Sequence, residues 1–337
     1  MSMIGLPIPM RIVGTGEYLP SRGVESVELD RRWSKPEGWT FQQTGVARRR
    51  FAASHETSSF MGARAARDAL EVAGIRFEEV DCLISACSVM EQPIPCLGAL
   101  LQREMGYGNS GIPAFDINAT CLSFLVALDM ASLAIATHRY RRILIVSVEV
   151  PSCGLNWDDV LTAPLFGDGA VAVLVESDTE QTGSALLTAR LEAYGDGADF
   201  CRVRAGGTRL RVKDDVRTFI DGAHFEMDGK MVYKQAASQL PGFLRRLFAG
   251  AEMEIGDMDW LIPHQASGKA LAHLRKASIL PEERVVHILE DHGNQLSASI
   301  PAGLHRVIAD GRLQRGQTVA LLGSGAGLSL GGSILKY

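Results

Sequence analysis

Three side chains that could act on a thioester stand at similar places in the sequence. Cys121 follows the apolar segment "PAFDI" and the turn "NAT", His264 ends the apolar run "WLIPH", and Asn294 follows a glycine in "EDHGNQLSASIP". A thiolate can hold an acyl group, and an imidazole and a carboxamide can donate hydrogen bonds to a developing enolate oxygen. Together the three residues favour chemistry on an acyl thioester.

Each of these residues also has a purely structural interpretation. A cysteine among apolar residues is commonly an inert part of the core, and an asparagine at a helix start is commonly an N-cap. A histidine at a strand end can be a buried polar residue with satisfied hydrogen bonds. For Cys121, the sequence predicts a helix that opens at the cysteine itself, and the positive end of the helix dipole would favour its thiolate.

The glycine-rich C-terminal segment "LLGSGAGLSLGGSILKY" could be mistaken for a dinucleotide-binding loop. Its spacing is GxGxG, and the residues after it predict a strand where a dinucleotide site requires a helix. We expect a tight turn near the site, in which the backbone N–H of Ala326 joins that of Cys121 in an oxyanion hole. In "LFGDGAVAVL", Asp168 is interpreted as a structural turn residue.

The elements that carry these residues alternate between short apolar strands and longer helical segments, an order typical of parallel βαβ units around a buried sheet. The order then repeats: "EEVDCLISACS" matches "GDMDWLIPHQAS", and "IPAFDINATC" matches "VVHILEDHGN". The sequence predicts an α/β fold of two similar halves, residues 1–178 with the cysteine and 179–337 with the histidine and asparagine. All three side chains would lie past the carboxyl ends of strands, where open α/β sheets bind ligands.

Composition argues against several classes of protein. The formal net charge of −5 does not fit a nucleic-acid binder, which needs a basic surface. No long uninterrupted apolar stretch predicts a membrane span, and the first residues lack the pattern of a signal peptide, so we expect a soluble cytoplasmic protein. The six cysteines form no CxxC pair, and no acidic or histidine cluster has the spacing of a metal site, so neither a disulfide scaffold nor a bound metal is expected.

With Cys121 in "DINATC", His264 in "PHQAS" and Asn294 in "HGNQLSASIP", together with "FGDGA" and the glycine-rich end, the sequence resembles the β-ketoacyl-ACP synthase III family of condensing enzymes. The resemblance runs from "GTGEYLP" and "TGVARR" to "GGSILKY". It implies a thiolase-like five-layered αβαβα fold, a homodimer, and these three residues as the catalytic groups. It implies no cofactor, since acyl-CoA or acyl-ACP and malonyl-ACP are substrates.

The resemblance also implies two reaction steps. An acyl group passes from acyl-CoA or an acyl carrier protein to Cys121. Malonyl-ACP then loses carbon dioxide, and its enolate attacks the acyl-enzyme while His264 and Asn294 donate hydrogen bonds to the malonyl thioester carbonyl. Two neutral donors in a dry site suffice for this chemistry, because decarboxylation itself generates the carbanion.

Relatives with other chemistry differ at particular positions. Biosynthetic thiolases have a second cysteine in the C-terminal glycine loop, and "GSGAG" has none. The acyl-CoA condensing enzymes of olefin synthesis have a glutamate base where this chain has Ile94, which cannot take a proton. Decarboxylative condensation is therefore favoured, and Glu91 nearby keeps the non-decarboxylating type as an alternative.

Three positions differ from the family pattern around the substrate. At the CoA entrance Trp39 and Thr44 are retained, but Gln43 and Val160 stand where arginines are expected. Because arginine offers both stacking and phosphate attraction, these changes predict weaker CoA binding and favour a carrier-bound acyl donor. "CLSF" also replaces a smaller motif after the nucleophile. We interpret the three differences as favouring a secondary-metabolite pathway over ordinary fatty acid synthesis.

An acidic carrier protein requires a basic surface where it docks. Lys234 and Lys269 lie on predicted helices of the second half and match docking positions of the family. Such charges are also common on any solvated helix face.

Three further interpretations come from other classes. A papain-like protease has Cys, His and Asn in this order, but a different sequence surrounds its cysteine. A non-catalytic partner subunit is disfavoured because all three chemical groups are retained. A thiolase-fold acyltransferase that passes the acyl group to an alcohol or amine is not distinguished by the sequence.

Overall fold

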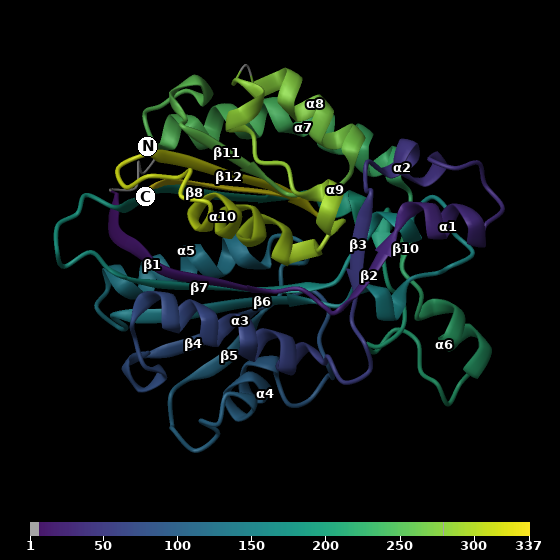
Figure 1. Cartoon of the computed structure of the whole chain (residues 1–337), viewed down its shortest axis with the longest axis horizontal. Coiled ribbons are helices and arrows are strands. Elements are labelled where there is room, and N and C mark those ends of the chain that lie inside the picture. Colours follow the sequence, from purple (N-terminus) through teal and green to yellow (C-terminus); the bar gives the residue numbers. More distant parts are fainter. Residues whose placement is uncertain (1–6, 279) are drawn as a thin grey trace.

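The protein is built of five layers, seen edge-on in Figure 1. The structure, a computed structural model, describes residues 7–278 and 280–337. From bottom to top in the figure, the layers are helices α3 and α4, a first sheet, helices α5 and α10, a second sheet, and helices α7 and α8. The predicted αβαβα architecture is confirmed.

The first sheet consists of strands of the N-terminal half. Its strand order is β1-β7-β6-β4-β5. The bounds are β1 Ile8–Tyr18, β4 Cys82–Ala86, β5 Ala114–Ile117, β6 Arg142–Glu149 and β7 Gly169–Ser177. Alternate residues of β7 face opposite layers: Val171, Val173 and Val175 pack on the central helices, whereas Ala170, Ala172 and Leu174 pack on the outer ones. Burial on both faces explains why "AVAVLV" is apolar throughout.

The second sheet repeats this order with strands of the C-terminal half. It runs β8-β13-β12-β11, and β8 also pairs with the first residues of β1, so nine strands are joined. The bounds are β8 Ala185–Ala193, β11 Trp260–Pro263, β12 Thr318–Gly325 and β13 Ser329–Lys336. In the first sheet, β5 pairs with β4 as the fifth strand. At the matching place in the second sheet, β11 has a parallel bridge between Leu261 and Val285. The two similar halves are thus observed; a boundary at residue 178 stays a prediction.

The sheets are mixed rather than wholly parallel. β4 is parallel to β5 and β6, and β11 is parallel to β12, as βαβ units predict. β7 and β13 are antiparallel to the strands that precede them, β6 and β12. The expectation of parallel units throughout was therefore wrong for these strands, because each returns along its sheet without a crossover helix.

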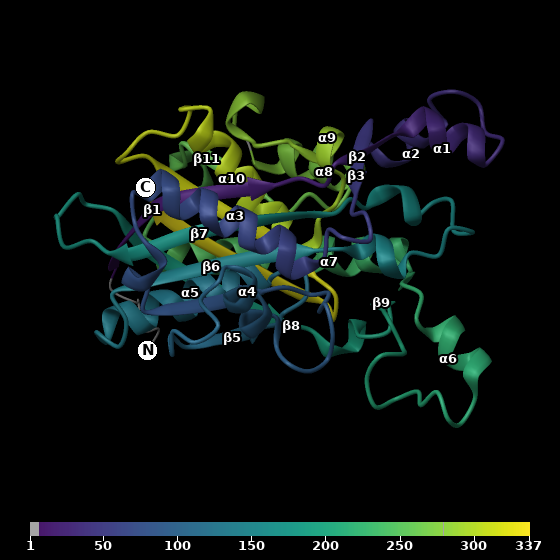
Figure 2. The same cartoon turned by 60° about the horizontal axis from the view of Figure 1, so that its bottom comes forward.

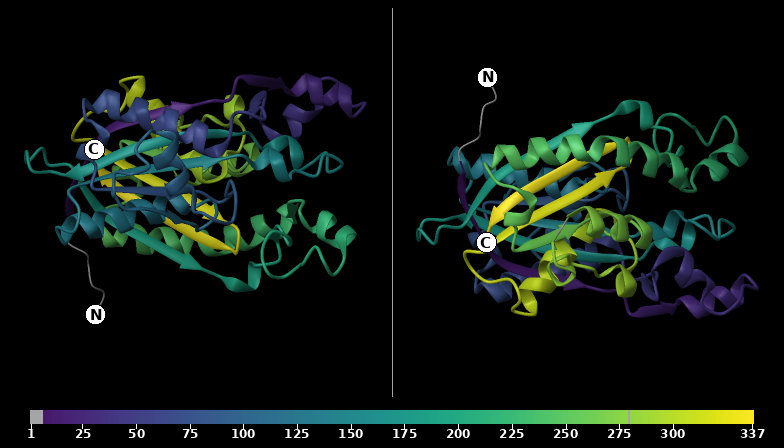
Figure 3. Two further views of the ribbon diagram at one scale, coloured as in Figure 1. Left: turned by 90° about the horizontal axis from the view of Figure 1, so that it is seen from below. Right: turned by 90° about the horizontal axis from the view of Figure 1, so that it is seen from above.

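Six helices cover the sheets. Their bounds are α3 Ser58–Ala73, α4 Leu97–Glu104, α5 Ser123–Ala136, α7 Gly229–Gly250, α8 Gly268–Ser278 and α10 Ser299–Ala309. In the right-hand view of Figure 3, from above, β12 and β13 (yellow) are visible between α7 and α8 (green). Within the described ranges, no helix is long and apolar enough to cross a membrane.

Smaller elements gather at the end of the layers where the carboxyl ends of the parallel strands lie. They are β2 Arg22–Glu25, α1 Ser26–Arg32, α2 Trp39–Thr44, β3 Arg48–Phe51, β9 Cys201–Arg202, α6 Val216–Gly222, β10 Glu226–Met227 and α9 Leu289–His292. Figure 2 shows α1 and α2 on one side of this end and α6 projecting on the other.

Candidate active site

The nucleophile candidate Cys121 lies in the turn between β5 and α5. The Ser123 hydroxyl donates to the Thr120 carbonyl at 2.7 Å and accepts from the Ala119 amide at 2.9 Å, which fixes the turn around the cysteine. Helix α5 begins at Ser123. The prediction that the helix opens at Cys121 was therefore wrong by two residues, because these hydrogen bonds form an ST-type turn before the first helical residue.

Burial determines the protonation of Cys121. It raises the pKa of the thiol well above its usual range, with smaller contributions from Cys201 and Glu149. The backbone N–H groups of Ala326 and of Cys121 itself lower the pKa of the thiol and partly oppose this shift. These N–H groups favour the thiolate, in the predicted direction, but desolvation is the larger effect and the free enzyme holds the thiol.

His264 follows β11 directly. Its backbone N–H donates to the Leu322 carbonyl of β12 at 2.7 Å, which continues the parallel pairing one residue past the strand. The side chain is buried, and burial lowers the pKa of the imidazole to about 4. Nδ1 has no hydrogen-bond partner among the described residues. The ring is therefore a neutral, desolvated group at the C-terminal end of a strand.

Hydrogen bonds fix both the backbone and the side chain of Asn294. Its backbone N–H donates to Leu165 at 2.8 Å, and its carbonyl accepts from Gly167 at 3.2 Å, so the residue is paired with the "FGDG" turn. In the side chain, Oδ1 accepts from the Leu296 amide at 2.9 Å and Nδ2 donates to the Ala266 carbonyl at 3.3 Å. The carboxamide is thus oriented, with its N–H face toward the loop that follows His264.

Strand β12 joins the nucleophile turn to the histidine. A Cβ added at Gly323 would lie 2.8 Å from the Leu122 side chain and 3.3 Å from Cβ of His264. At Gly325 an added Cβ would lie 2.6 Å from Oγ1 of Thr120. The glycines therefore let the strand pass between the two groups. The chain turns after β12, as predicted, and this turn brings the Ala326 amide to Cys121.

Asp168 has the predicted structural role. Its carboxylate accepts hydrogen bonds from the Ala52 amide at 2.8 Å and from the amide and hydroxyl of Ser152 at 3.1 and 2.5 Å. Burial raises the pKa of this carboxyl to about 6. The residue holds the "FGDG" turn against the β3 region, and that turn holds Asn294.

One buried carboxyl group was not predicted. Glu149, the last residue of β6, accepts hydrogen bonds from the amide and hydroxyl of Ser88, both at 2.6 Å, from the Val89 amide at 3.0 Å, and from the Ser297 hydroxyl. Burial raises the pKa of Glu149 to about 7. A charged residue at the end of the apolar run "RILIVSVEV" is the sequence signal that could have identified it.

Comparison with known proteins identifies the family. The profile described as 3-oxoacyl-[acyl-carrier-protein (ACP)] synthase III matches residues 115–195, and its C-terminal counterpart matches residues 248–337. A curated β-ketoacyl-[acyl-carrier-protein] synthase III of Methylococcus capsulatus is 36% identical over 327 residues, covering 97% of this chain and 98% of that protein. The chain belongs to the β-ketoacyl-[acyl-carrier-protein] synthase III family. It is a condensing enzyme and an acyltransferase.

Solved structures agree with this assignment. The 3-oxoacyl-(acyl carrier protein) synthase III of Pseudomonas aeruginosa has a TM-score of 0.86 and 32% identity and covers 98% of both chains. The priming β-ketosynthase of the R1128 polyketide pathway has a TM-score of 0.88 and 29% identity, over 98% of this chain and 97% of that one. The thiolase-like fold of this synthase III is therefore shared along nearly the whole chain.

An apolar cavity of about 150 Å³ adjoins the residues against which Cys121 packs. Cys121 packs against the apolar cluster that contains Phe166 and Leu296, and both of these residues line the cavity. The full lining is Val89, Pro151, Cys153, Gly154, Leu155, Phe166, Val203, Ala223, Phe225 and Leu296. This cavity can take the alkyl part of an acyl group bound to the sulfur.

The predicted entrance residues lie on α2 and on the loop before "FGDG". Trp39 and Gln43 are half-buried, and Lys35 lies over the Trp39 ring with Nζ 5.1 Å from its centroid. Thr44 is buried, and its hydroxyl bonds within the helix to the Thr40 carbonyl at 2.8 Å, so its role is to shape α2. Val160 is half-buried in the segment that precedes the contact of α2 with residues 163–165.

The predicted docking lysines lie on the two helices that cover the second sheet. Lys234 on α7 and Lys269 on α8 are both exposed. Gly45, at the end of α2, lies so close to Gly268 that an added Cβ would be 2.9 Å from its Cα. The entrance helix therefore adjoins the start of α8, next to Lys269.

Glu91 is engaged away from the nucleophile turn. Its carboxylate accepts a hydrogen bond of 2.6 Å from the Ser59 amide in the first turn of α3, where a negative charge is stabilised by the helix dipole. Ile94 is 85% exposed. Neither residue therefore supplies a buried base beside Cys121 in this chain.

Proposed function

We propose that this enzyme joins an acyl group to a malonyl thioester, with Cys121 as nucleophile and His264 and Asn294 as hydrogen-bond donors. The observation that carries the proposal is the position of Cys121 between two backbone N–H groups and an apolar cavity. Such a cysteine is suited to form and hold a thioester, because the two amide N–H groups can donate hydrogen bonds to the developing oxyanion.

In the first step, sulfur of Cys121 attacks the carbonyl carbon of an acyl thioester, and the thiol of CoA or of the carrier leaves with the cysteine proton. The Ala326 and Cys121 amides stabilise the tetrahedral oxyanion. The alkyl chain occupies the cavity lined by Phe166, Phe225 and Leu296.

In the second step, the malonyl carboxylate leaves as carbon dioxide, and the electron pair of the broken bond forms the enolate. His264 and Asn294 stabilise its oxygen. The enolate carbon attacks the acyl carbon, the bond to sulfur breaks, and the released thiolate of Cys121 takes a proton from solvent water, as its raised pKa favours. Because His264 is neutral, with a pKa lowered to about 4, it serves as a donor and carries no charge at neutral pH.

We propose that the acyl donor is carried by acyl carrier protein. Gln43 and Val160 offer no cation to CoA phosphates, whereas Lys234 and Lys269 are exposed and Lys269 lies beside the end of α2. Malonyl-ACP is the proposed second substrate, and the relatives' names give acyl carrier protein as the carrier of their own β-ketoacyl group. No cofactor and no metal takes part in the proposed steps.

We propose a cytoplasmic homodimer. All six cysteines are free, as expected in a reducing compartment. β5 is the edge strand of the first sheet and carries the exposed Phe115, while α5, packed against it, exposes Met130 and Leu133. An unpaired edge strand with apolar neighbours is a suitable surface for a second copy.

We assign the enzyme to a secondary-metabolite pathway. Gln43, Val160 and the "CLSF" motif support this assignment, and the R1128 priming ketosynthase is a relative with such a role. The competing assignment is the initiation of ordinary fatty acid synthesis. Measuring which acyl donor the enzyme prefers distinguishes the two assignments.

Intact-protein mass spectrometry tests the reaction. Wild type and Cys121→Ala are incubated with acyl-CoA and acyl-carrier donors and then chased with malonyl-ACP. We expect an acyl adduct on wild type alone, discharged with release of carbon dioxide and a β-ketoacyl product. An adduct that malonyl-ACP never discharges would instead indicate transfer to an alcohol or amine, and no adduct at all would indicate a non-catalytic subunit.

A further inference from the structure

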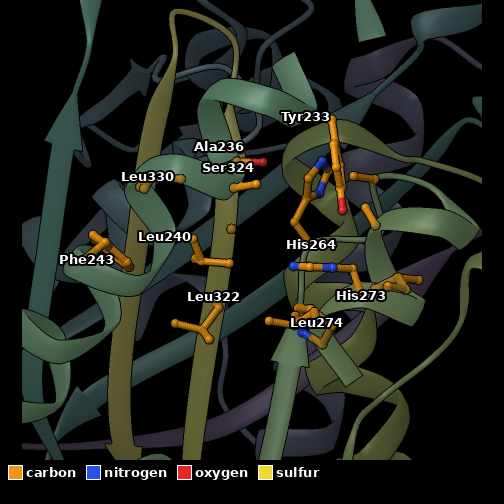
Figure 4. Close-up of a pocket in the computed structure, with 16 residues that line it drawn as sticks. Tyr233, Ala236, Leu240, Phe243, His264, His273, Leu274, Leu322, Ser324 and Leu330 are labelled. Atoms are coloured by element: carbon orange, nitrogen blue, oxygen red, sulfur yellow. The ribbon is translucent and has the colours of Figure 1, made fainter. Parts of the chain in front are cut away.

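A second apolar cavity, of about 110 Å³, lies between α7, α8 and the second sheet. Figure 4 shows the imidazole of His264 beside the ring of Tyr233 at one end, with Leu240, Leu322 and Leu330 toward the other. Its walls come from α7, α8, β12, β13 and the loop after β11. The catalytic histidine is therefore part of the wall of this space.

Small side chains on the facing elements create the space. Alanines line it at positions 236, 237, 266 and 270, and the small residues Gly323 and Ser324 line it on the β12 side. The exposed rings of Tyr233 and His273, with centroids 5.8 Å apart, lie at the surface end. Inside, leucines and Phe243 complete an apolar lining.

This cavity is separate from the one beside Cys121. The two cavities share no lining residue, and only the α7–α8 cavity borders His264. The acyl group on Cys121 already has an apolar space of its own. The α7–α8 cavity is thus available to a group on the other substrate, the one whose carbonyl oxygen His264 receives in the proposed function.

The size selects a short hydrocarbon group. An engineered apolar cavity of about 150 Å³ holds benzene, so a space of this size takes a branch of a few carbon atoms. An unsubstituted malonyl group has no carbon to place there. A substituent on its α-carbon begins three bonds from the carbonyl oxygen that His264 receives.

We propose that the α7–α8 cavity binds the α-alkyl substituent of a branched malonyl thioester, such as methylmalonyl or ethylmalonyl thioester. The proposal rests on the proposed function. The substituted malonyl group loses carbon dioxide, the substituted enolate carbon bonds to the acyl carbon, and the bond to Cys121 breaks. The product is an α-alkyl-β-ketoacyl thioester, and the sulfur regains a proton.

The test compares malonyl-, methylmalonyl- and ethylmalonyl-carrier protein as second substrates of pre-acylated enzyme. Ala236→Leu fills the cavity from α7, Leu240→Ala enlarges it, and Ser238→Leu adds the same leucine to the exposed side of α7 as a control. We expect wild type to use ethylmalonyl thioester with a kcat/KM within about tenfold of malonyl, since apolar pockets discriminate weakly per carbon.

The variants should then separate the substrates. Ala236→Leu should lower kcat/KM for ethylmalonyl by about 10- to 100-fold and leave malonyl within about twofold. Leu240→Ala should be at least as active as wild type on ethylmalonyl, and Ser238→Leu should resemble wild type on all three substrates. Wild type that condenses malonyl but neither branched substrate would overturn the proposal. So would an Ala236→Leu enzyme slowed equally on all three, which would place the pantetheine arm in the cavity. Failure of the proposed function is seen separately, as wild type that does not release carbon dioxide from malonyl thioester.

Discussion

The thiol and the imidazole of this site are both uncharged near neutral pH. Burial raises the pKa of the Cys121 thiol and lowers that of His264 to about 4. A thiolate–imidazolium pair, as in cysteine proteases, would require the opposite shifts. Neutral partners fit a reaction in which decarboxylation supplies the carbanion and the protein supplies hydrogen bonds.

Replacement of the nucleophile should abolish acylation. For Cys121→Ala we expect a loss of at least about 1000-fold in product formation, because no other residue can hold the acyl group. Cys96→Ser, at the half-buried position before α4, is the matched control. Steady-state assays of both variants provide the measurement, and a Cys121→Ala enzyme with more than a tenth of wild-type activity would contradict the assignment.

The buried histidine should make stability fall in mild acid. The unfolded chain binds a proton at His264 near pH 6.5, whereas the folded chain binds it only near pH 4. As pH falls between these values, this group lowers the free energy of unfolding by about 2 to 3 kcal/mol in total, and above pH 6.5 it has no effect.

Denaturant titrations of wild type and His264→Gln at pH 7.0, 5.5 and 4.5 give the free energy of unfolding of each protein. The difference between the two proteins at each pH measures the contribution of His264. Glu149 and Asp168, whose pKa values are raised to about 7 and about 6, contribute with the opposite sign but occur in both proteins. A difference between the two proteins that does not change with pH would show that His264 is not desolvated.

Close approach of α3 to β1 determines the packing of the first sheet. A Cβ added at Gly14 or Gly16 would lie 2.1 or 2.3 Å from the carbonyl oxygen of Ala69 or Ala65. Both contacts are to helix backbone, which cannot give way as a flexible side chain can. The alanines of α3 and the glycines of β1 therefore act together to bring the helix onto the sheet.

Gly16→Ala should therefore destabilise the protein. We expect the free energy of unfolding to fall by about 1 to 3 kcal/mol, the usual cost of overpacking. Gly207→Ala is the control, because nothing lies near that position and its backbone is ordinary. Equal denaturation midpoints for the two variants would show that α3 shifts without cost.

The sequence was sufficient to predict the repeated order of elements and the three chemical residues. The apolar run of each strand and the residue after it are local features, so Cys121, His264 and Asn294 could be placed at strand ends. The antiparallel return of β7 and β13, the partners of Glu149 and the two cavities could not be predicted. They depend on contacts between segments such as Ser88 and Ser297, which are far apart in the chain.

At the scale of the whole molecule, two surfaces of the chain are suited to partners. The β5 edge with its exposed apolar neighbours belongs to the first half, and the exposed Lys234 and Lys269 belong to the second. A second copy and a carrier protein can therefore bind without competing for one surface.

Phe115→Asp should weaken the proposed dimer. A charge on the edge strand would be desolvated at a contact between copies, so we expect a shift toward monomer in sedimentation velocity at micromolar concentration. Val72→Asp, on the exposed side of α3, should leave the mass unchanged. If wild type itself sediments as a monomer, the dimer proposal is wrong.

Reversal of charge at Lys234 and Lys269 should affect the carrier substrate alone. For the double Lys→Glu variant we expect KM for malonyl-ACP to rise about tenfold or more at low salt, because charge pairs steer docking, and KM for a malonyl-pantetheine thioester to be unchanged. Lys336→Glu, exposed at the far end of β13, is the control. Equal effects on both substrates would argue against a docking role.

The amide that faces Cys121 is provided by Ala326, close to the end of the chain and more than half its length after the cysteine. During synthesis at about 5 to 20 residues per second, the cysteine thus exists for about 10 to 40 s before Ala326 has been made. Until Ala326 has been made, a growing chain has the thiol but lacks one of the two donors of the proposed oxyanion hole. We therefore expect acyl transfer to Cys121 to be slow at that stage.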